Sequence, residues 1–195
     1  MQWSSAYNTQ LVAMKKIIFF DGDGTLWYPR KTKFSAPPWI IYEKDGDMHV
    51  EMKRQMLMPN VKETLRSLKK RGIRLAIIST QPDGTKAERD ARLHTKLKHF
   101  GIAQFFDYVE ASKVIAHHTK PDSKDNEILK ILKKAHLPKS SALMVGDQYG
   151  SDYVPAKKAG ISAVMIDGFT YERKDRRHLR VRRKITDIGG IFKYL

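Results

Sequence analysis

Two carboxylates separated by one residue stand directly after a short apolar run near the start of the chain. The run is Ile17 to Phe20, and Asp21, Gly22 and Asp23 follow it. An apolar run that ends in glycine-bearing turn residues predicts a buried parallel strand, and open α/β sheets bind ligands outside the carboxyl ends of such strands. Two like charges this close raise each other's proton affinity unless a cation lies between them. The pair therefore suits a divalent metal ion, or an acid beside a base.

Further polar residues with chemical potential follow later apolar runs. Ser79 and Thr80 come after Leu75 to Ile78, and Asp147 comes after Leu143 to Gly146, with Asp152 five residues beyond it. Lys120-Pro121 lies between these two groups. Because parallel strands end at the same edge of a sheet, we expect the aspartates, the hydroxyls and a lysine to gather there.

Most of these residues also have an ordinary structural interpretation. Asp21-Gly22-Asp23 does not fit an EF-hand, which needs a preceding helix, a glycine at its sixth position and a glutamate at its twelfth, whereas those positions hold Leu26 and Thr32. The same tripeptide recurs at Asp45-Gly46-Asp47, where we predict only a hairpin turn. Asp152 alone could be a helix N-cap, and Ser79 alone a turn residue.

Four motifs in this order resemble those of the haloacid dehalogenase superfamily, most of whose members are magnesium-dependent phosphatases that form an aspartyl-phosphate. Asp21-x-Asp23-x-Thr25 is similar to the first motif, Ser79-Thr80 to the second, Lys120-Pro121 to the third, and Gly146-Asp147 with Asp152 to the fourth. Leu26-Trp27 and the short insert before the second motif resemble the nearly capless magnesium-dependent phosphatase family. The family usually has Asn after the hydroxyl of the second motif, where this chain has Thr80-Gln81-Pro82.

The resemblance implies a role for each motif residue. Asp21 would be the nucleophile and Asp23 the general acid and base. Mg²⁺ would bind to Asp21, Asp23 and Asp147. Gly22, Ser79, Thr80 and Lys120 would hold the phosphate, with Lys113 a competitor for the lysine role, and Thr25 and Asp152 would support the site. Apart from the resemblance, Trp27, Tyr28, Gln81 and Tyr149 could line a substrate pocket, but apolar packing of the flap explains most of the aromatic residues equally well.

The spacing of apolar residues along the chain predicts an α/β fold with alternating strands and helices. Helices are expected from Pro59 to Gly72, from Thr85 to Phe100, from Asp125 to Ala135 and from Asp152 to Gly160. Strands are expected at Arg74 to Ser79, Phe105 to Val109, Ala142 to Val145 and Ser162 to Ile166. Right-handed crossovers then make a Rossmann-like parallel sheet with helices on both faces.

One segment, residues 27–58, breaks this alternation. Its centre predicts a β-hairpin, in which Trp39 to Tyr42 and Met48 to Met52 flank Asp45-Gly46-Asp47. We expect a short flap over the site and no full cap domain, within a single domain of residues 1–195. Residues 1–13 are expected to be an N-terminal extension.

Composition restricts the class of protein and its partners. A chain of 195 residues with 41% hydrophobic residues can build one α/β core. It has no cysteine and no apolar stretch of membrane-spanning length, so we expect an intracellular, cytoplasmic protein with no membrane partner. Lys and Arg number 37 against 21 acids, a formal charge of +16, with a basic block from Arg173 to Lys184. Such a block is usually a solvated face, but it can bind nucleic acid.

Three functions follow from these observations. The first is a magnesium-dependent phosphomonoesterase acting on an aryl phosphate, a sugar phosphate or a phosphoprotein. The second is a phosphatase of nucleic-acid 3' or 5' ends that uses the basic block. The third is a non-catalytic binding or regulatory protein with the same fold. The intact set of Asp21, Asp23, Lys120 and Asp147 favours an enzyme.

Overall fold

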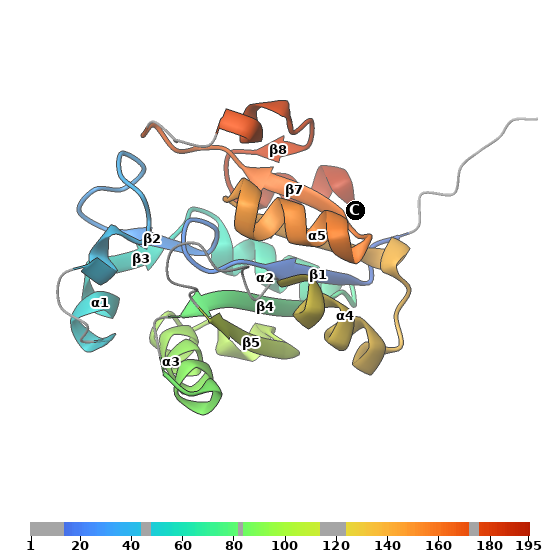
Figure 1. The fold of residues 1–195 in the computed structure, drawn as a ribbon, viewed down its shortest axis with the longest axis horizontal. Helices are drawn as coiled ribbons and strands as arrows, with labels where there is room; N and C mark the ends of the chain where they lie inside the picture. Colours follow the sequence, from blue (N-terminus) through green and yellow to red (C-terminus); the bar gives the residue numbers. More distant parts are fainter. Residues whose placement is uncertain (1–13, 44–47, 82–83, 114–123, 172–175) are drawn as a thin grey trace, which may run out of the picture.

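The computed structural model describes residues 14–43, 48–81, 84–113, 124–171 and 176–195. Its centre is a six-stranded sheet in the order β5-β4-β1-β6-β7-β8, in which every pair of neighbours is parallel (Figure 1). The strands are β1 (Ile17–Phe20), β4 (Arg74–Gln81), β5 (Tyr108–Lys113), β6 (Ala142–Gly146), β7 (Ser162–Ile166) and β8 (Lys184–Ile185). The predicted α/β class and parallel sheet are therefore confirmed.

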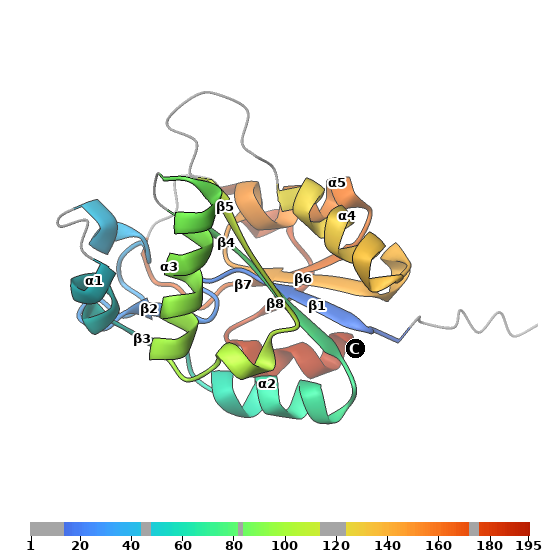
Figure 2. The ribbon, with the colours of Figure 1, turned by 90° about the horizontal axis from the view of Figure 1, so that it is seen from below.

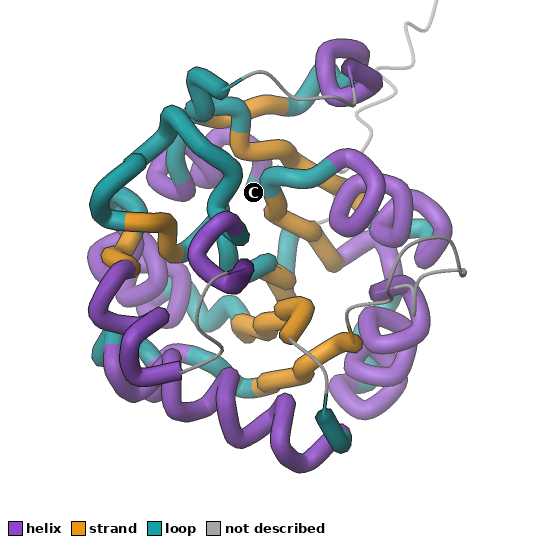
Figure 3. Tube along the Cα trace, turned by 60° about the vertical axis from the view of Figure 1, so that its left-hand side comes forward, coloured by secondary structure: helices purple, strands orange, loops and turns teal. Residues whose placement is uncertain are grey.

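Helices cover both faces of this sheet, as Figures 2 and 3 show. On one face lie α2 (Val61–Lys70), α3 (Lys86–His99) and the 3-10 helix Ile188–Tyr194. On the other lie α4 (Lys124–Ala135) and α5 (Val154–Ala159). Capping explains the local boundaries of α3 and α5. Thr85 and Glu88 form a reciprocal capping box at the start of α3, and Gly160 ends α5 with φ +79°.

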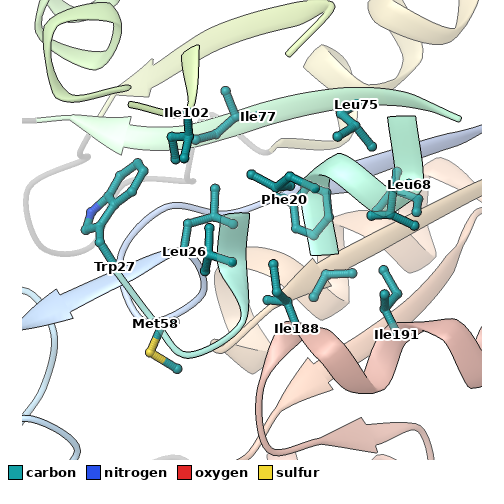
Figure 4. Close-up of a cluster of buried hydrophobic side chains, with 14 of the residues drawn as sticks. Phe20, Leu26, Trp27, Met58, Leu68, Leu75, Ile77, Ile102, Ile188 and Ile191 are labelled. Carbon is teal, nitrogen blue, oxygen red and sulfur yellow. The ribbon is translucent and has the colours of Figure 1, made fainter. Parts of the chain in front are cut away.

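The central strand is buried on both faces because its side chains alternate between two apolar clusters. Ile18 and Phe20 belong to the cluster under α2 and α3, whereas Ile17 and Phe19 belong to the cluster under α4 and α5. Figure 4 shows the first cluster, in which Phe20 and Ile77 of the sheet meet Ile188 of the C-terminal 3-10 helix. This burial holds β1, and the residues directly after it, in a rigid frame.

The insert differs from the predicted hairpin. Its two ends, β2 (Trp27–Pro29) and β3 (Gln55–Leu57), pair as antiparallel strands. Its centre contains a 3-10 helix, Ile40–Glu43, and the helix α1 (Met48–Arg54), where strands were expected. The expected turn at 45–47 lies outside the described residues. The prediction was wrong because a five-residue apolar alternation does not separate a strand from one helical turn. Glu51 near the start of α1 and Arg54 at its end also suit a helix dipole.

No helix among the described residues has the length and apolar character needed to cross a bilayer.

Candidate active site

The motif residues meet at the edge where the central strands end. Asp21 follows β1, Asp147 follows β6, and Ser79 lies near the end of β4. The Asp21 amide donates a hydrogen bond of 3.0 Å to the Val145 carbonyl, which continues the β1–β6 ladder past the last strand residue. The strands thereby bring together residues that are more than 120 positions apart, as the sequence predicted.

Three buried carboxylates and one buried lysine form the centre of this site. Asp21, Asp147 and Asp152 each offer one carboxylate oxygen, and these oxygens lie within 4.8 Å of one another. Lys124, the first residue of α4, is 3% exposed, and its Nζ lies 2.5 Å from Asp21 Oδ1 and 2.6 Å from Asp152 Oδ1. The Gln148 amide donates to Asp152 Oδ2 over 2.9 Å. Asp152 therefore orients the lysine that contacts Asp21.

Burial and charge change the proton affinities of this cluster. Burial, together with the nearby charge of Asp152, raises the pKa of Asp21 to about 7, although Lys124 opposes the shift. Burial lowers the pKa of Lys124, but the carboxylates of Asp152 and Asp21 outweigh it, and the net pKa is raised above that of an ordinary lysine. The ammonium is therefore the charged partner in this group.

The donor set fits a hard divalent cation. Oxygens of Asp21, Asp147 and Asp152 lie close together in a buried site, and carboxylate oxygens are the ligands that Mg²⁺ prefers. The turn after Asp21 brings the backbone close to Asp147, because a Cβ on Gly24 would lie 2.6 Å from Asp147 Oδ2. Gly24 also has φ +77°, which favours glycine. Of the residues predicted as metal ligands, Asp21 and Asp147 belong to this carboxylate group, and its third member is Asp152 and not Asp23.

The second aspartate of the first motif is held by the insert. Asp23 Oδ1 accepts one hydrogen bond from Trp27 Nε1 and one from Gln55 Nε2, each 2.9 Å long. Trp27 begins β2 and Gln55 begins β3, so the pairing of these strands places both donors on the same carboxylate. Two N–H donors on one carboxylate oxygen orient the group and exclude other rotamers.

A second lysine is buried beside this arrangement. Lys96 of α3 is 1% exposed, and its Nζ lies 5.4 Å from the centroid of the Trp27 ring. Burial lowers the pKa of Lys96, and the carboxylates of Asp23 and Glu51 oppose that shift. The site therefore has a buried cation on each side, Lys124 toward Asp21 and Lys96 toward Asp23.

Two of the predicted phosphate-binding residues, Gly22 and Ser79, lie next to each other at this edge of the sheet. A Cβ on Gly22 would lie 2.6 Å from Ser79 Oγ, so the backbone at Gly22 closely approaches this hydroxyl. Gln81 Nε2 donates to Ser79 Oγ over 3.3 Å. Thr80 instead faces β5, with its Oγ1 3.2 Å from Ser112 Oγ. The buried hydroxyl of Thr25 has no hydrogen-bond partner among the described residues.

The predicted substrate pocket requires correction. Trp27 is fully buried and stacks on Phe100 at 5.5 Å, and Tyr28 is 5% exposed and stacks on Phe34 at 4.8 Å. Gln81 is also buried. Trp27 and Tyr28 belong to the main apolar cluster, and Gln81 belongs to β4 and contacts Ser79, so these three side chains present little surface to a substrate. Tyr149 is partly exposed beside the site and stacks on Tyr153 at 5.3 Å.

The comparison with known families agrees with this arrangement. The family model described as haloacid dehalogenase-like hydrolase matches residues 29–166, which include Ser79, Lys124 and Asp147. This chain is a member of the haloacid dehalogenase-like hydrolases. The resemblance stated from the four motifs is thereby confirmed. The finer assignment to the nearly capless magnesium-dependent branch stays a prediction.

Curated relatives of this haloacid dehalogenase-like protein include phosphatases of small molecules. A phosphoglycolate phosphatase from Pseudomonas savastanoi pv. phaseolicola is 31% identical over 121 residues, which are 60% of this chain and 40% of the relative. A glyceraldehyde 3-phosphate phosphatase from Methanothermobacter thermautotrophicus is 31% identical over 56% of this chain and 44% of its own length. The chain thus spans less than half the length of these relatives.

Solved structures share the fold of this haloacid dehalogenase-like protein. A putative phosphatase from Clostridium difficile has a TM-score of 0.69 at 20% identity, and covers 93% of this chain and 99% of its own. A predicted phosphoglycolate phosphatase from Haemophilus somnus has a TM-score of 0.66 at 19% identity, over 92% and 97%.

The lysine at the site was missed by sequence reasoning. Lys120 lies outside the described residues, as does the pair His117-His118, whereas Lys124 is the lysine that contacts Asp21. A signal for Lys124 was present in the chain. It occupies the same helical face as Ile128 and Ile131, both buried, and a lysine on a buried face needs an acidic partner.

Proposed function

We propose that this protein is a magnesium-dependent phosphomonoesterase that acts through an aspartyl-phosphate on Asp21. The main support for the proposal is that two aspartates follow the same strand but have different hydrogen-bond and ion-pair partners. Asp21 lies in a buried carboxylate cluster with Lys124, and Asp23, two residues later, is fixed by hydrogen bonds from the insert. Two carboxylates in separate environments can divide nucleophilic and acid–base roles.

In the first step, a carboxylate oxygen of Asp21 attacks phosphorus, and the bond between phosphorus and the ester oxygen breaks. Asp23 gives its proton to that departing oxygen, which leaves as an alcohol. Trp27 and Gln55 donate hydrogen bonds to Asp23, whereas Lys124 pairs with Asp21, so the two aspartates have different partners and different roles.

In the second step, Asp23 accepts a proton from water, and the resulting hydroxide attacks the phosphorus of the aspartyl-phosphate. The phosphorus–Asp21 bond breaks, inorganic phosphate leaves, and both aspartates return to their starting states. Asp23 therefore acts first as an acid and then as a base, and it can do both from the same position.

The remaining polar groups would bind the phosphoryl oxygens. Lys124 supplies a positive charge beside Asp21, and the Ser79 hydroxyl lies next to the Gly22 backbone. Asp21, Asp147 and the backbone carbonyl of Asp23 would hold Mg²⁺, with Asp152 as the neighbouring acid. When bound, Mg²⁺ would neutralise negative charge on the transferring group.

We infer that the substrates are small phosphomonoesters, because the phosphatases that this chain resembles are named for phosphoglycolate and glyceraldehyde 3-phosphate. Phosphate release from these two esters, from p-nitrophenyl phosphate and from a phosphotyrosine peptide would test this, with MgCl₂ and with EDTA. Release from the small esters only in the presence of MgCl₂ is expected.

The role of Asp21 is tested by the nearly isosteric variant Asp21→Asn, whose amide does not attack phosphorus. Loss of at least about a thousandfold in kcat is expected, the scale seen when a covalent nucleophile is removed. Glu127→Gln, which removes the same charge from a surface position of α4, is the matched control. Normal turnover by folded Asp21→Asn protein would remove this residue from the mechanism. An inactive wild-type protein would favour a binding function.

A further inference from the structure

A basic groove lies away from the catalytic edge, between α5 and the segment that leads into β8. It has a volume of about 380 Å³. Lys157 and Tyr153 line one side, Ser162 at the start of β7 lies at the base, and the other side is lined by Arg180, Arg182 and Arg183. Asp21 follows the carboxyl end of β1, whereas Ser162 opens β7 at the opposite end of the parallel sheet. The groove is therefore separate from the candidate active site.

Within the described part of the chain, the cations of this groove have no acidic partner. Among the described residues, no ion pair involves Lys157, Arg180, Arg182 or Arg183. A fifth cation, Lys15, donates a hydrogen bond of 3.3 Å to Ser162 Oγ. Four cations that line one cavity repel one another, and a polyanion bound there would relieve this repulsion.

The positive charge around the groove also acts on Lys15. Burial lowers the pKa of Lys15, and the charge of Arg183 lowers it further. Lys15 also donates to the Ser140 carbonyl over 2.7 Å, so its position is fixed at the end of the groove. A cation whose charged form is disfavoured by a neighbouring cation indicates a locally positive potential.

Aromatic rings extend from the groove toward the catalytic edge. Tyr153, which lines the groove, stacks on Tyr149 with ring centroids 5.3 Å apart and an interplanar angle of 20°. The guanidinium of Arg177 lies 5.1 Å from the centroid of the Tyr149 ring. Both tyrosines belong to the π-helical turn Tyr149–Tyr153, which also contains Asp152 of the catalytic cluster. Two stacked rings therefore lie between Arg177 and the cations of the groove.

We propose that this groove binds the sugar–phosphate backbone of single-stranded nucleic acid. The four cations exceed the two negative charges of one phosphate monoester, and they belong to two separate chain segments, α5 and residues 180–183. A chain of phosphodiesters presents negative charges at intervals along such a surface, and these can pair with cations on both sides of the groove. The inference goes beyond the proposed phosphatase reaction and does not depend on it.

The test measures binding by the full-length protein of a fluorescein-labelled single strand of about 20 nucleotides, longer than the usual site of one binding module. The label is attached to an internal base, both ends of the strand are hydroxyl groups, and EDTA is present, so the candidate active site has no phosphomonoester to bind. Fluorescence anisotropy is measured over a range of salt concentrations. Wild-type protein is expected to bind, with an affinity that falls steeply as salt rises.

The decisive comparison uses two double variants of equal net charge. Lys157→Gln with Arg182→Gln removes two cations from the groove, and Arg66→Gln with Lys70→Gln removes two exposed cations from α2 on the opposite face of the sheet. The groove double is expected to weaken binding at least about tenfold and to reduce the salt slope by about 1.4, at roughly 0.7 per phosphate contact. The α2 double is expected to change the affinity by less than about twofold.

Equal weakening by the two double variants would overturn the proposal, because binding would then follow net charge alone. Equally tight binding of polyglutamate, with the same dependence on the groove residues, would assign the groove to an acidic polypeptide. Displacement of the strand by inorganic phosphate, but not by chloride at matched ionic strength, would show that the groove binds a single anion. Absence of binding by the wild-type protein at low salt would also refute it.

Discussion

Replacing Lys124 by methionine should destabilise the protein far more than the same change elsewhere on the helix. Lys124 is buried and pairs with Asp21 and Asp152 at 2.5 and 2.6 Å. Methionine keeps most of the side-chain volume but leaves these carboxylates without their shared cation. Removal of one partner from a buried ion pair costs about 3–5 kcal/mol in free energy of unfolding.

For Lys124→Met we expect a loss of unfolding free energy at the lower end of this range. The pKa of Asp21 is already about 7 with Lys124 present, so without the lysine this carboxyl takes up a proton at neutral pH and part of the electrostatic cost is removed. For a chain of this size, 1 kcal/mol shifts Tm by about 2–4 °C. A loss of about 3 kcal/mol then corresponds to a decrease in Tm of about 6–12 °C.

The assay is thermal unfolding in EDTA, followed by circular dichroism. Lys130→Met is the matched control, because Lys130 is on the same helix and its exposed pair with Glu127 is worth about 1 kcal/mol at most. The double variant Lys124→Met with Asp152→Asn removes the lysine and one of its acidic partners together, and it should lose less than the sum of the two single losses. Added Mg²⁺ should restore part of the loss in Lys124→Met, because a bound cation stabilises the folded state.

Two results would refute this reasoning. One is a Tm for Lys124→Met that lies as close to wild type as that of Lys130→Met. The other is strict additivity in the double variant, which would mean that the lysine and Asp152 do not act on one another.

Two further predictions concern the acid–base group. Asp23→Asn should slow hydrolysis of an alkyl phosphate far more than that of p-nitrophenyl phosphate, whose leaving group departs with little protonation; equal losses for both esters, measured as kcat, would limit Asp23 to metal binding. Gln55→Leu removes one of the two hydrogen bonds to Asp23 and should lower kcat for the alkyl ester by about 10–100-fold, from roughly 1.5–3 kcal/mol for a hydrogen bond to a charged group. Gln104→Leu, at an exposed position, is its control, and a normal kcat in Gln55→Leu would contradict the positioning role.

Much of the fold could be predicted because its strands are short, apolar and followed by turn residues. Ile17 to Phe20 and Ser162 to Ile166 are strands with the expected bounds, since each is buried on both faces or nearly so. Asp21 and Asp147 were expected to lie close together because each follows a strand of a parallel sheet, and such strands end at the same edge. The places of these residues depend on the local pattern of apolar residues and on the order of strands and helices, and both can be read from the sequence.

The contacts of the site depend on tertiary register, and these could not be predicted. Gln55 is 32 residues from Asp23, and only the pairing of β2 with β3 brings its amide to that carboxylate. The choice among lysines depends on where α4 begins relative to the sheet edge, which the spacing between motifs does not determine. The insert was also misjudged, because Met48 to Met52 is too short for its periodicity to distinguish helix from strand.

The pairing of β2 with β3 also has an evolutionary consequence. The hydrogen bonds from Trp27 and Gln55 to Asp23, the proposed acid–base group, come from the two ends of the insert. A longer connection between these ends adds little closure entropy, because that cost grows only with the logarithm of length. The segment that joins β2 to β3 can therefore lengthen over generations while Asp23 keeps these hydrogen bonds. New substrate preferences can arise in this segment without a new catalytic apparatus.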